Sequence, residues 1–531
     1  MNISGLLSQQ AREQPDAVAL ADTWQGSQRR TTFRQLEQWS ARLAGQLDLS
    51  GLQPGDRVLV LQPLAAELFA TLGAVFRLGL VAVMFDPSCR RELLDRYCEL
   101  STPRALICSR RAHLLRFLSR ALRRIPLKWS TGGRVPGARL LRNNPGDPSL
   151  FRMHHCPPDT PALLTFTSGS TGLPRIAVRS HGFLTAQHRA VQTCLDLRPG
   201  QIQLASLPTF ILANLASGVT SILADTDLRH PDRLDAARIV HQLRVHAADR
   251  LLAGPTFCEL LTQWCDANGV QLSRLTHIFT GGGPIAPRLL SRLRLTAPRA
   301  IVVLVYGATE AEPIARITSD EICPADQDRI WQGGGLPAGF PVRGIHLRIV
   351  KDPWPAGTGR LTEPQFGRLC LSPPAAGEIV VHGDHVLGAA VEGQIPDDKF
   401  LVDGVCWHRT GDAGRVDGQG RLWLLGRCAG RVTDRRGTLY PFQVEQPVLQ
   451  LPCVRRAALA GAQSRRVLFI EPALDVRDSD LSEMRRLTAF AEIDEIRCAA
   501  KIPMDPRHHA KVDYVALQSM IDTLAPVSSP R

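Results

Sequence analysis

The stretch Thr165-Phe-Thr-Ser-Gly-Ser-Thr-Gly-Leu-Pro-Arg175 follows the apolar residues Ala162 to Leu164 and has little side-chain bulk. Gly169 and Gly172 allow backbone N–H groups to turn toward one point, and Arg175 adds a fixed positive charge. The hydroxyl donors are Thr167, Ser168, Ser170 and Thr171. Such a concave array of amides and hydroxyls suits a phosphate group, although the G-x-x-x-x-G-K-[ST] spacing of the common nucleotide loop is absent. A Ser/Gly-rich surface loop is the simpler alternative.

Further motifs follow this loop in order, and together they span about residues 10 to 515. They are Thr280-Gly-Gly-Gly-Pro284, Val305-Tyr-Gly-Ala-Thr-Glu310, His408-Arg-Thr-Gly-Asp412, Gly426-Arg427 and Arg507-His-His-Ala-Lys511. The set resembles the adenylate-forming ligases, a superfamily that includes acyl-CoA synthetases, fatty-acyl-AMP ligases, nonribosomal adenylation domains and luciferases. The resemblance implies attack of a substrate carboxylate on the α-phosphate of ATP, which releases pyrophosphate and leaves an acyl-adenylate.

The resemblance also assigns roles to individual residues. The residues that would bind the β- and γ-phosphates are Thr167, Ser168, Gly169, Ser170, Thr171, Gly172 and Arg175. The adenine would contact the turn with Gly282 and Gly283 and would stack on Tyr306, which Gly307 follows. The catalytic set is Thr309 at the α-phosphate, Glu310 as the Mg²⁺ ligand, and Lys511. Asp412 would accept the ribose hydroxyls, Arg427 would fix the nucleotide at the domain junction, and His181 and Phe210 are candidates for the acyl pocket.

The residue types fit these roles. Both reactants are anionic, so the site must neutralise charge and hold them in line. A carboxylate oxygen such as that of Glu310 is a hard ligand suited to Mg²⁺. Lys511 is one of only five lysines among 63 basic residues, and a flexible ammonium can follow charge that develops on the α-phosphate. The alternatives are a surface glutamate, a turn aspartate at Asp412, a surface lysine, and packed core roles for His181 and Phe210.

Several positions depart from the family pattern and bear on the second half-reaction. Arg175 stands where lysine is usual, Ala429 where the hinge residue is acidic or lysine, and Arg436 where a loop glycine approaches the pantetheine tunnel. Other stretches resemble the branch with olefin β-lactone synthetases, in which the 3-hydroxyl of a β-hydroxy fatty acid attacks its own adenylate. They are Gly426-Arg427, Arg431-Val432, Gly437-Thr-Leu-Tyr440, Tyr306-Gly-Ala-Thr-Glu310 and Asp505-Pro-Arg-His-His-Ala-Lys511. Transfer to CoA or another thiol, such as that of an acyl-carrier protein, ranks first by family numbers. Lactone closure is the alternative, and a catalytically weak adenylate-binding homologue is a third possibility.

The alternation of strand-like and helical segments predicts an α/β fold with parallel sheets covered on both faces. Expected strands are 57–62, 81–85, 105–108, 162–166, 201–207, 278–280, 301–305, 377–382 and 421–425, and expected helices include 33–47 and 231–246. Proline and glycine punctuation from about 351 to 391 indicates a β-rich subdomain. The resemblance implies a large N-terminal adenylation domain, residues 1–425, of stacked sheets with helices. It also implies a small mobile α+β C-terminal domain, residues 426–531, which carries Lys511.

Composition limits the function classes. The chain has 531 residues, 44% hydrophobic and 21% charged, which is ordinary for a globular protein of more than one domain. Its 13 cysteines show no C-x-x-C pair, which argues against a zinc site or disulfide frame. Residues 64–85 contain Glu67 and Arg77 and predict a buried helix ending at Gly79 with a strand after it, not a membrane span. Without a visible leader or membrane span, the expected location is the cytoplasm.

The net charge of +13 does not by itself predict nucleic-acid binding, because arginines are spread through the chain and no such motif occurs. Residues 110–125 form one dense basic patch with apolar residues at helical spacing. This patch could lie on an anionic membrane or face an acyl-carrier protein. A solvated helix face with extended arginine side chains is the simpler interpretation.

Overall fold

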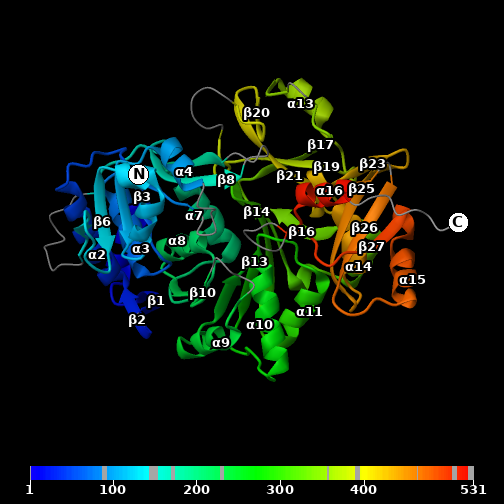
Figure 1. Ribbon diagram of the computed structural model, residues 1–531, viewed down its shortest axis with the longest axis horizontal. Helices are drawn as coiled ribbons and strands as arrows, with labels where there is room; N and C mark the ends of the chain where they lie inside the picture. The colour runs from blue at the N-terminus through cyan, green and yellow to red at the C-terminus, as the bar shows by residue number, and fades with distance from the viewer. Residues whose placement is uncertain are drawn as a thin grey trace. The chain divides into compact units, whose positions relative to one another are not determined.

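The computed structural model describes residues 2–24, 26–85, 93–142, 153–168, 174–227, 233–355, 358–388, 395–462, 465–504 and 511–523. The chain divides into two compact units, Met1–Leu252 and Ala253–Arg531. Helices and strands alternate along both, so the predicted α/β class is confirmed (Figure 1). Across the described parts of the chain, every helix is too short or too polar to cross a bilayer.

The first unit contains a seven-stranded sheet in which only the β8–β9 pair is antiparallel. Its strands, in spatial order, are β7 (Arg139–Leu140), β6 (Leu127–Thr131), β5 (Ala105–Ser109), β3 (Arg57–Leu61), β4 (Val81–Val83), β8 (Pro161–Ser168) and β9 (Pro174–Ser180). The segment 64–85 folds as predicted, into buried helix α3 (Ala66–Arg77) and strand β4. α3 packs against α2 (Phe33–Asp48), which begins at a reciprocal cap: Thr32 Oγ1 accepts from the Gln35 N–H and Gln35 Oε1 from the Thr32 N–H.

A second group of strands in the first unit is also mainly parallel. β12 (Arg250–Ala253), β10 (Ile202–Ala205), β11 (Thr220–Leu223) and β1 (Val18–Trp24) pair in that order, and β2 (Ser27–Thr32) closes the edge as an antiparallel partner of β1. The accompanying helices are α1 (Ser4–Glu13), α7 (His181–Leu195), α8 (Pro208–Ala216) and α9 (Ala236–Val245).

The second unit contains a mixed sheet that carries most of the sequence motifs. Its main path is β13 (His277–Gly281), β14 (Ile301–Ala308), β15 (Ala311–Thr318), β16 (Leu336–Pro341), β22 (Leu422–Arg427), β21 (Val405–Val416), β19 (Gly377–His382) and β17 (His346–Val350). β20 (Lys399–Val402) pairs with β21, and β18 (Arg360–Leu361) pairs with β20. Within 351–391 the described elements are strands β18 and β19 and helix α13 (Glu363–Leu369), so a β-rich subdomain there stays a prediction. Helices α10 (Pro255–Ala267) and α11 (Pro287–Thr296) lie in the α/β part.

Residues beyond Arg427 build a separate apolar core within the second unit. β25 (Val454–Ala462), β26 (Arg465–Pro472) and β27 (Glu495–Cys498) form a three-stranded sheet, and α14 (Pro441–Val448) and α16 (Tyr514–Thr523) pack on β25 (Figure 1). α14 also contacts α15 (Asp478–Leu487). The core residues of this region, such as Val444, Leu459 and Leu468, are fully buried. A boundary near Gly426 stays a prediction.

Candidate active site

Two of the glycine-containing motifs lie side by side at the carboxyl ends of parallel strands. Gly281 at the end of β13 pairs with Val305 on β14, so the Thr280–Pro284 and Val305–Glu310 segments leave the sheet at the same edge. A Cβ on Gly281 would lie 2.3 Å from the Val305 carbonyl oxygen, and Gly282 has a φ of +83°. Gly281 therefore allows the two strands to approach this closely, and Gly282 allows a left-handed backbone that other residues rarely adopt. Ligands commonly bind at such strand ends in α/β sheets.

Glu310 lies in a tight turn between β14 and β15. Ala308 and Ala311 face each other across the hairpin, which leaves Thr309 and Glu310 as the two turn residues. Two hydrogen bonds through Leu387 hold this turn in place. The Glu310 carbonyl accepts from the Leu387 N–H at 2.8 Å, and buried Lys399 donates its Nζ to the Leu387 carbonyl at 2.6 Å. Burial lowers the pKa of Lys399, and the charge of Asp398, followed by smaller effects of Cys406 and Glu310, opposes that shift.

The residues at this turn fit a Mg²⁺–nucleotide complex. The Glu310 carboxylate is half-exposed, and its backbone is held on both sides. Among the described residues, no group of three or more histidine, cysteine or acidic side chains could hold a metal alone. Mg²⁺ in nucleotide sites commonly uses one or two carboxylates together with phosphate oxygens. When bound, the ion would neutralise phosphate charge beside Glu310.

Tyr306, Asp412 and Arg427 form a hydrogen-bonded constellation from three strands. The Tyr306 hydroxyl donates to Asp412 Oδ2 at 2.9 Å, and Arg427 Nη1 donates to Asp412 Oδ1 at 3.0 Å. Asp412 on β21 lies directly opposite Arg427 on β22. Burial, and then the Asp412 charge, raises the pKa of Tyr306 far above its ordinary value, so the phenol stays a donor. Three predicted nucleotide contacts are thus brought together; stacking of Tyr306 on adenine stays a prediction.

Glu378 on β19 supports the backbone that carries Asp412. Its Oε2 accepts from Arg409 Nε at 3.0 Å and Nη2 at 2.7 Å, and its Oε1 accepts from the Gly411 N–H at 3.2 Å. The side chain is almost fully buried; burial raises its pKa, and the Arg409 guanidinium opposes that shift. Glu378 belongs to none of the motifs recognisable in the sequence. Its place in the strand Gly377-Glu-Ile-Val-Val-His382 gave only a β-strand signal.

We expect Glu378→Gln to raise the KM for ATP about tenfold while the KM for the acid stays unchanged. The amide keeps one acceptor oxygen but loses the charge-assisted bonds to Arg409, which contribute about 1.5–3 kcal/mol each, so the Asp412 segment is less well positioned. Steady-state kinetics with each substrate varied measures the split. Glu363→Gln is the matched control because it makes the same change at an exposed glutamate. Equal changes in both KM values would indicate a general loss of structure instead.

The predicted phosphate loop is described only at its two ends. Thr167 and Ser168 end β8, and Arg175 lies near the start of β9, opposite Thr167 in the strand register. Gly169, Ser170, Thr171 and Gly172 lie outside the described residues. The predicted strand-to-loop placement at the end of β8 is confirmed, and the phosphate contacts stay predictions.

Lys511 precedes helix α16. Met504 and Val512 pair as an isolated bridge, and the Asp513 N–H donates to the Pro503 carbonyl at 3.0 Å. The half-buried Lys511 comes directly before these paired residues. Tyr514 fixes the start of α16 by donating its hydroxyl to Glu445 Oε1 at 2.8 Å. Burial raises the pKa of Glu445 to about 7. Residues 505–510 of the predicted motif lie outside the described residues.

His181 and Phe210, the candidates for the acyl pocket, are both buried in the first unit. His181 Nδ1 accepts from the Ile3 N–H at 3.2 Å, and its ring meets Phe76 edge-on with centroids 6.3 Å apart. Burial lowers the pKa of His181 to about 4, so the ring is neutral at pH 7. These contacts fit the packed role that the sequence left open, and a pocket role for either residue stays a prediction.

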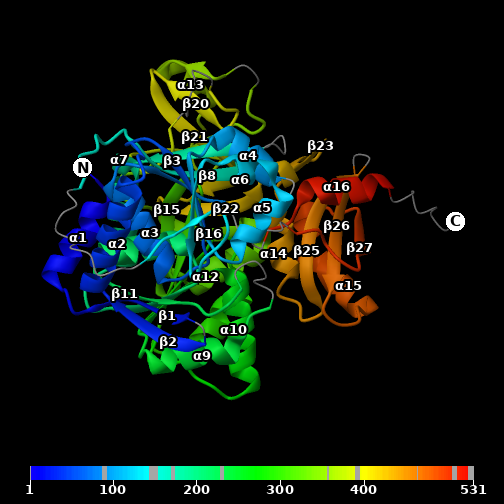
Figure 2. The same cartoon turned by 60° about the vertical axis from the view of Figure 1, so that its left-hand side comes forward.

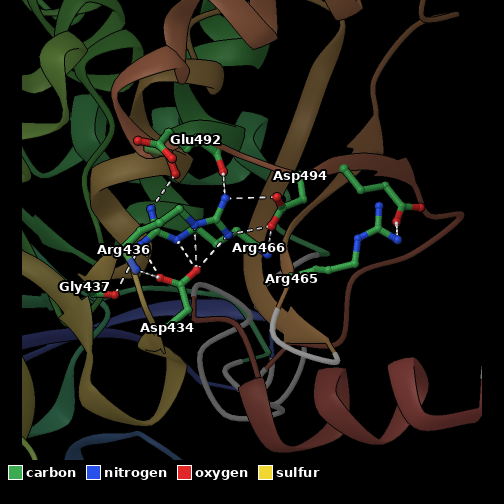
Figure 3. Close-up of polar contacts among 9 residues, drawn as sticks. Asp434, Arg436, Gly437, Arg465, Arg466, Glu492 and Asp494 are labelled. Atoms are coloured by element: carbon green, nitrogen blue, oxygen red, sulfur yellow. Dashed lines mark hydrogen bonds and ion pairs between the residues drawn. The ribbon is translucent and has the colours of Figure 1, made fainter.

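The departures at the hinge and at Arg436 have definite structural settings. Ala429 is exposed in the turn Cys428–Gly430, and the following Arg431 pairs with buried Asp352 at 3.0 Å. Arg436 bonds to Asp434 and Asp494, each at 2.7 Å, and Arg466 bonds to the same Asp434 at 2.8 Å (Figure 3). This network ties the hairpin of β23 (Val432–Asp434) and β24 (Gly437–Leu439) to the C-terminal sheet.

The strand-end turns, the Tyr306–Asp412–Arg427 constellation and the ordered motifs agree with a match to a known family. The model of the family described as AMP-binding enzyme matches residues 7–388. The chain belongs to the AMP-binding enzyme family. It is accordingly an ATP-dependent acid ligase that forms an acyl-adenylate, and the predicted family and enzyme class are confirmed.

Named relatives of this AMP-binding enzyme differ in what their names say they make. It is 28% identical to an olefin β-lactone synthetase from Xanthomonas campestris, with 96% of each chain covered. It is also 28% identical to an indoleacetate–CoA ligase from Aromatoleum aromaticum, over 92% of this chain and 91% of the relative. Among solved structures it resembles the amide bond synthetase McbA from Marinactinospora thermotolerans, with a TM-score of 0.81, 21% identity and coverage of 98% and 99%. This last likeness concerns the fold alone.

Proposed function

We propose that this AMP-binding enzyme activates a 3-hydroxy fatty acid as its acyl-AMP and then closes the product to a β-lactone without CoA. The Tyr306–Asp412–Arg427 constellation beside the Glu310 turn is the observation that supports the nucleotide half of the reaction. The likeness to an olefin β-lactone synthetase over nearly the whole chain favours the lactone half.

In the first step a carboxylate oxygen attacks the α-phosphorus of ATP, and the bond from that phosphorus to pyrophosphate breaks. Asp412, held by Tyr306 and Arg427, would accept the ribose hydroxyls. Lys511 would donate to the α-phosphate as negative charge grows on it. Glu310 would hold the Mg²⁺ that partly neutralises the triphosphate.

In the second step the 3-hydroxyl oxygen attacks the acyl carbon, the bond from that carbon to AMP breaks, and the hydroxyl proton passes to solvent. Because both reacting groups belong to one molecule, the attack benefits from a high effective concentration. Arg436, held by Asp434 and Asp494, occupies the position that the resemblance assigns to a glycine near the pantetheine tunnel. A bulky, fixed side chain there argues against a pantetheine-bearing acceptor.

Transfer of the acyl group to CoA is the second candidate function. The relatedness to an indoleacetate–CoA ligase over most of the chain supports it, and the sequence alone ranks it first.

Mass spectrometry of the products from ATP, Mg²⁺ and a 3-hydroxy fatty acid tests the proposal. We expect pyrophosphate release without CoA and a product with the mass of the acid minus one water. The matched 3-methoxy acid should release pyrophosphate but give no lactone, because its oxygen cannot lose a proton. If no lactone formed and a thioester appeared when CoA was added, transfer to CoA would replace lactone closure as the second half-reaction. No pyrophosphate from any acid would overturn the adenylation proposal.

A further inference from the structure

The basic patch at residues 110–125 does not fold as one amphipathic helix, and its apolar residues do not share one buried stripe. It forms three short pieces, η1 (Ala112–Leu114), α5 (Leu115–Leu118) and α6 (Arg120–Arg124). Ser119 separates the last two, because its extended backbone ends α5 and its Oγ caps α6 by accepting from the Leu122 N–H at 3.1 Å. The helical spacing predicted a continuous face, and this serine cap divides it.

The division sorts the apolar residues into two sets. Leu122 and Ile125 are buried in the core beneath, and Leu115 and Ala121 pack against it. Leu114 at the end of η1 and Phe117 and Leu118 in α5 are instead 63%, 77% and 62% exposed. Three neighbouring large apolar side chains this exposed cost free energy in water, and such patches commonly mark an interaction surface. Figure 2 shows α5 and α6 next to α4 (Leu93–Ser101) on the surface of the first unit.

Arginines surround this apolar set. Arg110, Arg111, Arg120, Arg123 and Arg124 are all exposed, and segment 110–125 contains no acidic residue. None of the ion pairs described for this part of the chain involves them. Asp95 on α4 is the acidic group that faces the patch; it accepts from Ser119 Oγ and from the Ala121 N–H at 3.1 Å, and the Arg123 charge acts on it. The patch therefore combines outward apolar side chains with a strong positive charge.

We propose that α5 and α6 dock this enzyme onto the surface of an anionic phospholipid membrane, with Leu114, Phe117 and Leu118 entering the acyl boundary and the arginines facing the headgroups. A bilayer interface accepts exposed apolar side chains and guanidinium groups together without a matching recess, which an acidic protein partner would need. The proposal does not depend on the identity of the acid or of the acyl acceptor.

Flotation of the full chain with phosphatidylcholine vesicles, with and without phosphatidylglycerol, tests this surface. We expect binding to the anionic vesicles at low salt and release at high salt. Leu114→Ser/Phe117→Ser/Leu118→Ser should weaken binding at least about tenfold. Arg120→Gln/Arg123→Gln/Arg124→Gln should also weaken it at least about tenfold, since each arginine near such a surface contributes about fivefold.

Two controls make the same kinds of substitution at exposed sites elsewhere in the first unit, one of them at a single leucine and the other at three arginines. Leu49→Ser removes a leucine that is 85% exposed, and Arg12→Gln/Arg189→Gln/Arg233→Gln removes the same charge. Both should bind vesicles as the wild type does. Absence of vesicle binding, or equal losses in the controls, would overturn the proposal. Retention on an immobilised acidic acyl-carrier protein without vesicle binding would assign the patch to a protein partner. If the wild type were a dimer and the triple serine variant a monomer, the patch would be assigned to contact with a second copy of this chain.

Discussion

Replacing Lys511 with alanine is expected to slow pyrophosphate release about 10²–10³-fold. The reason is that an ammonium donor aimed at developing phosphate charge stabilises the transition state more than the ground state, by about 3–4 kcal/mol. The Met504–Val512 bridge and the Tyr514–Glu445 hydrogen bond do not involve the Lys511 side chain, so the surrounding structure should persist. Single-turnover measurement of pyrophosphate with the preferred acid gives the effect on chemistry directly.

Lys501→Ala is the matched control for this experiment. Lys501 is exposed and lies ten positions before Lys511 in the same C-terminal region. It should retain wild-type pyrophosphate release and the same melting temperature. If Lys511→Ala released pyrophosphate at the wild-type rate, the catalytic role would have to pass to another group.

Asp412→Asn is expected to lower kcat/KM for ATP about a hundredfold. Both oxygens of the carboxylate accept hydrogen bonds, from Tyr306 and from Arg427, and they would also accept from the ribose hydroxyls. An asparagine amide has only one acceptor oxygen, and its NH₂ group would face one of these donors without being able to accept from it. Hydrogen bonds to charged groups contribute about 1.5–3 kcal/mol each, so losing one or two accounts for the fall. Tyr306→Phe removes one donor and keeps the carboxylate, so it should have a smaller effect of about tenfold.

Asp403→Asn serves as the control for charge removal in the same part of the second unit. Asp403 is exposed with a φ of +44°, a backbone conformation that asparagine also tolerates. We expect unchanged kinetics for this variant. A wild-type kcat/KM for Asp412→Asn, measured by ATP titration at saturating acid, would exclude Asp412 from nucleotide binding.

Much of the fold could be predicted because strand and helix signals are local. Strand β19 (Gly377–His382) has the predicted bounds, and β3, β5, β13 and α2 match their predicted segments within about one residue. The buried helix and strand in 64–85 were predicted from apolar runs punctuated by Gly79. The continuous amphipathic face at 110–125 was wrong, because Ser119 adopts an extended backbone and caps a second helix, a choice that apolar spacing does not encode.

In the candidate site, too, some residues could be predicted from the sequence and others could not. Tyr306, Glu310, Asp412 and Arg427 could be named from short motifs, since each motif carries its own residue types. Glu378 and Lys399 could not, because each acts through partners distant in sequence: Glu378 through Arg409 and Gly411, and Lys399 through the Leu387 carbonyl.

By itself, the sequence determined the α/β class, the order of the motifs and the kinds of chemistry they can carry, because these depend on local periodicity and residue type. Only the tertiary structure decided that Tyr306 and Arg427 share the two oxygens of Asp412, and that Arg436 is fixed by two aspartates. Those contacts join residues up to 106 positions apart in the chain. They arise from strand pairing and packing, which place side chains together irrespective of their separation in sequence.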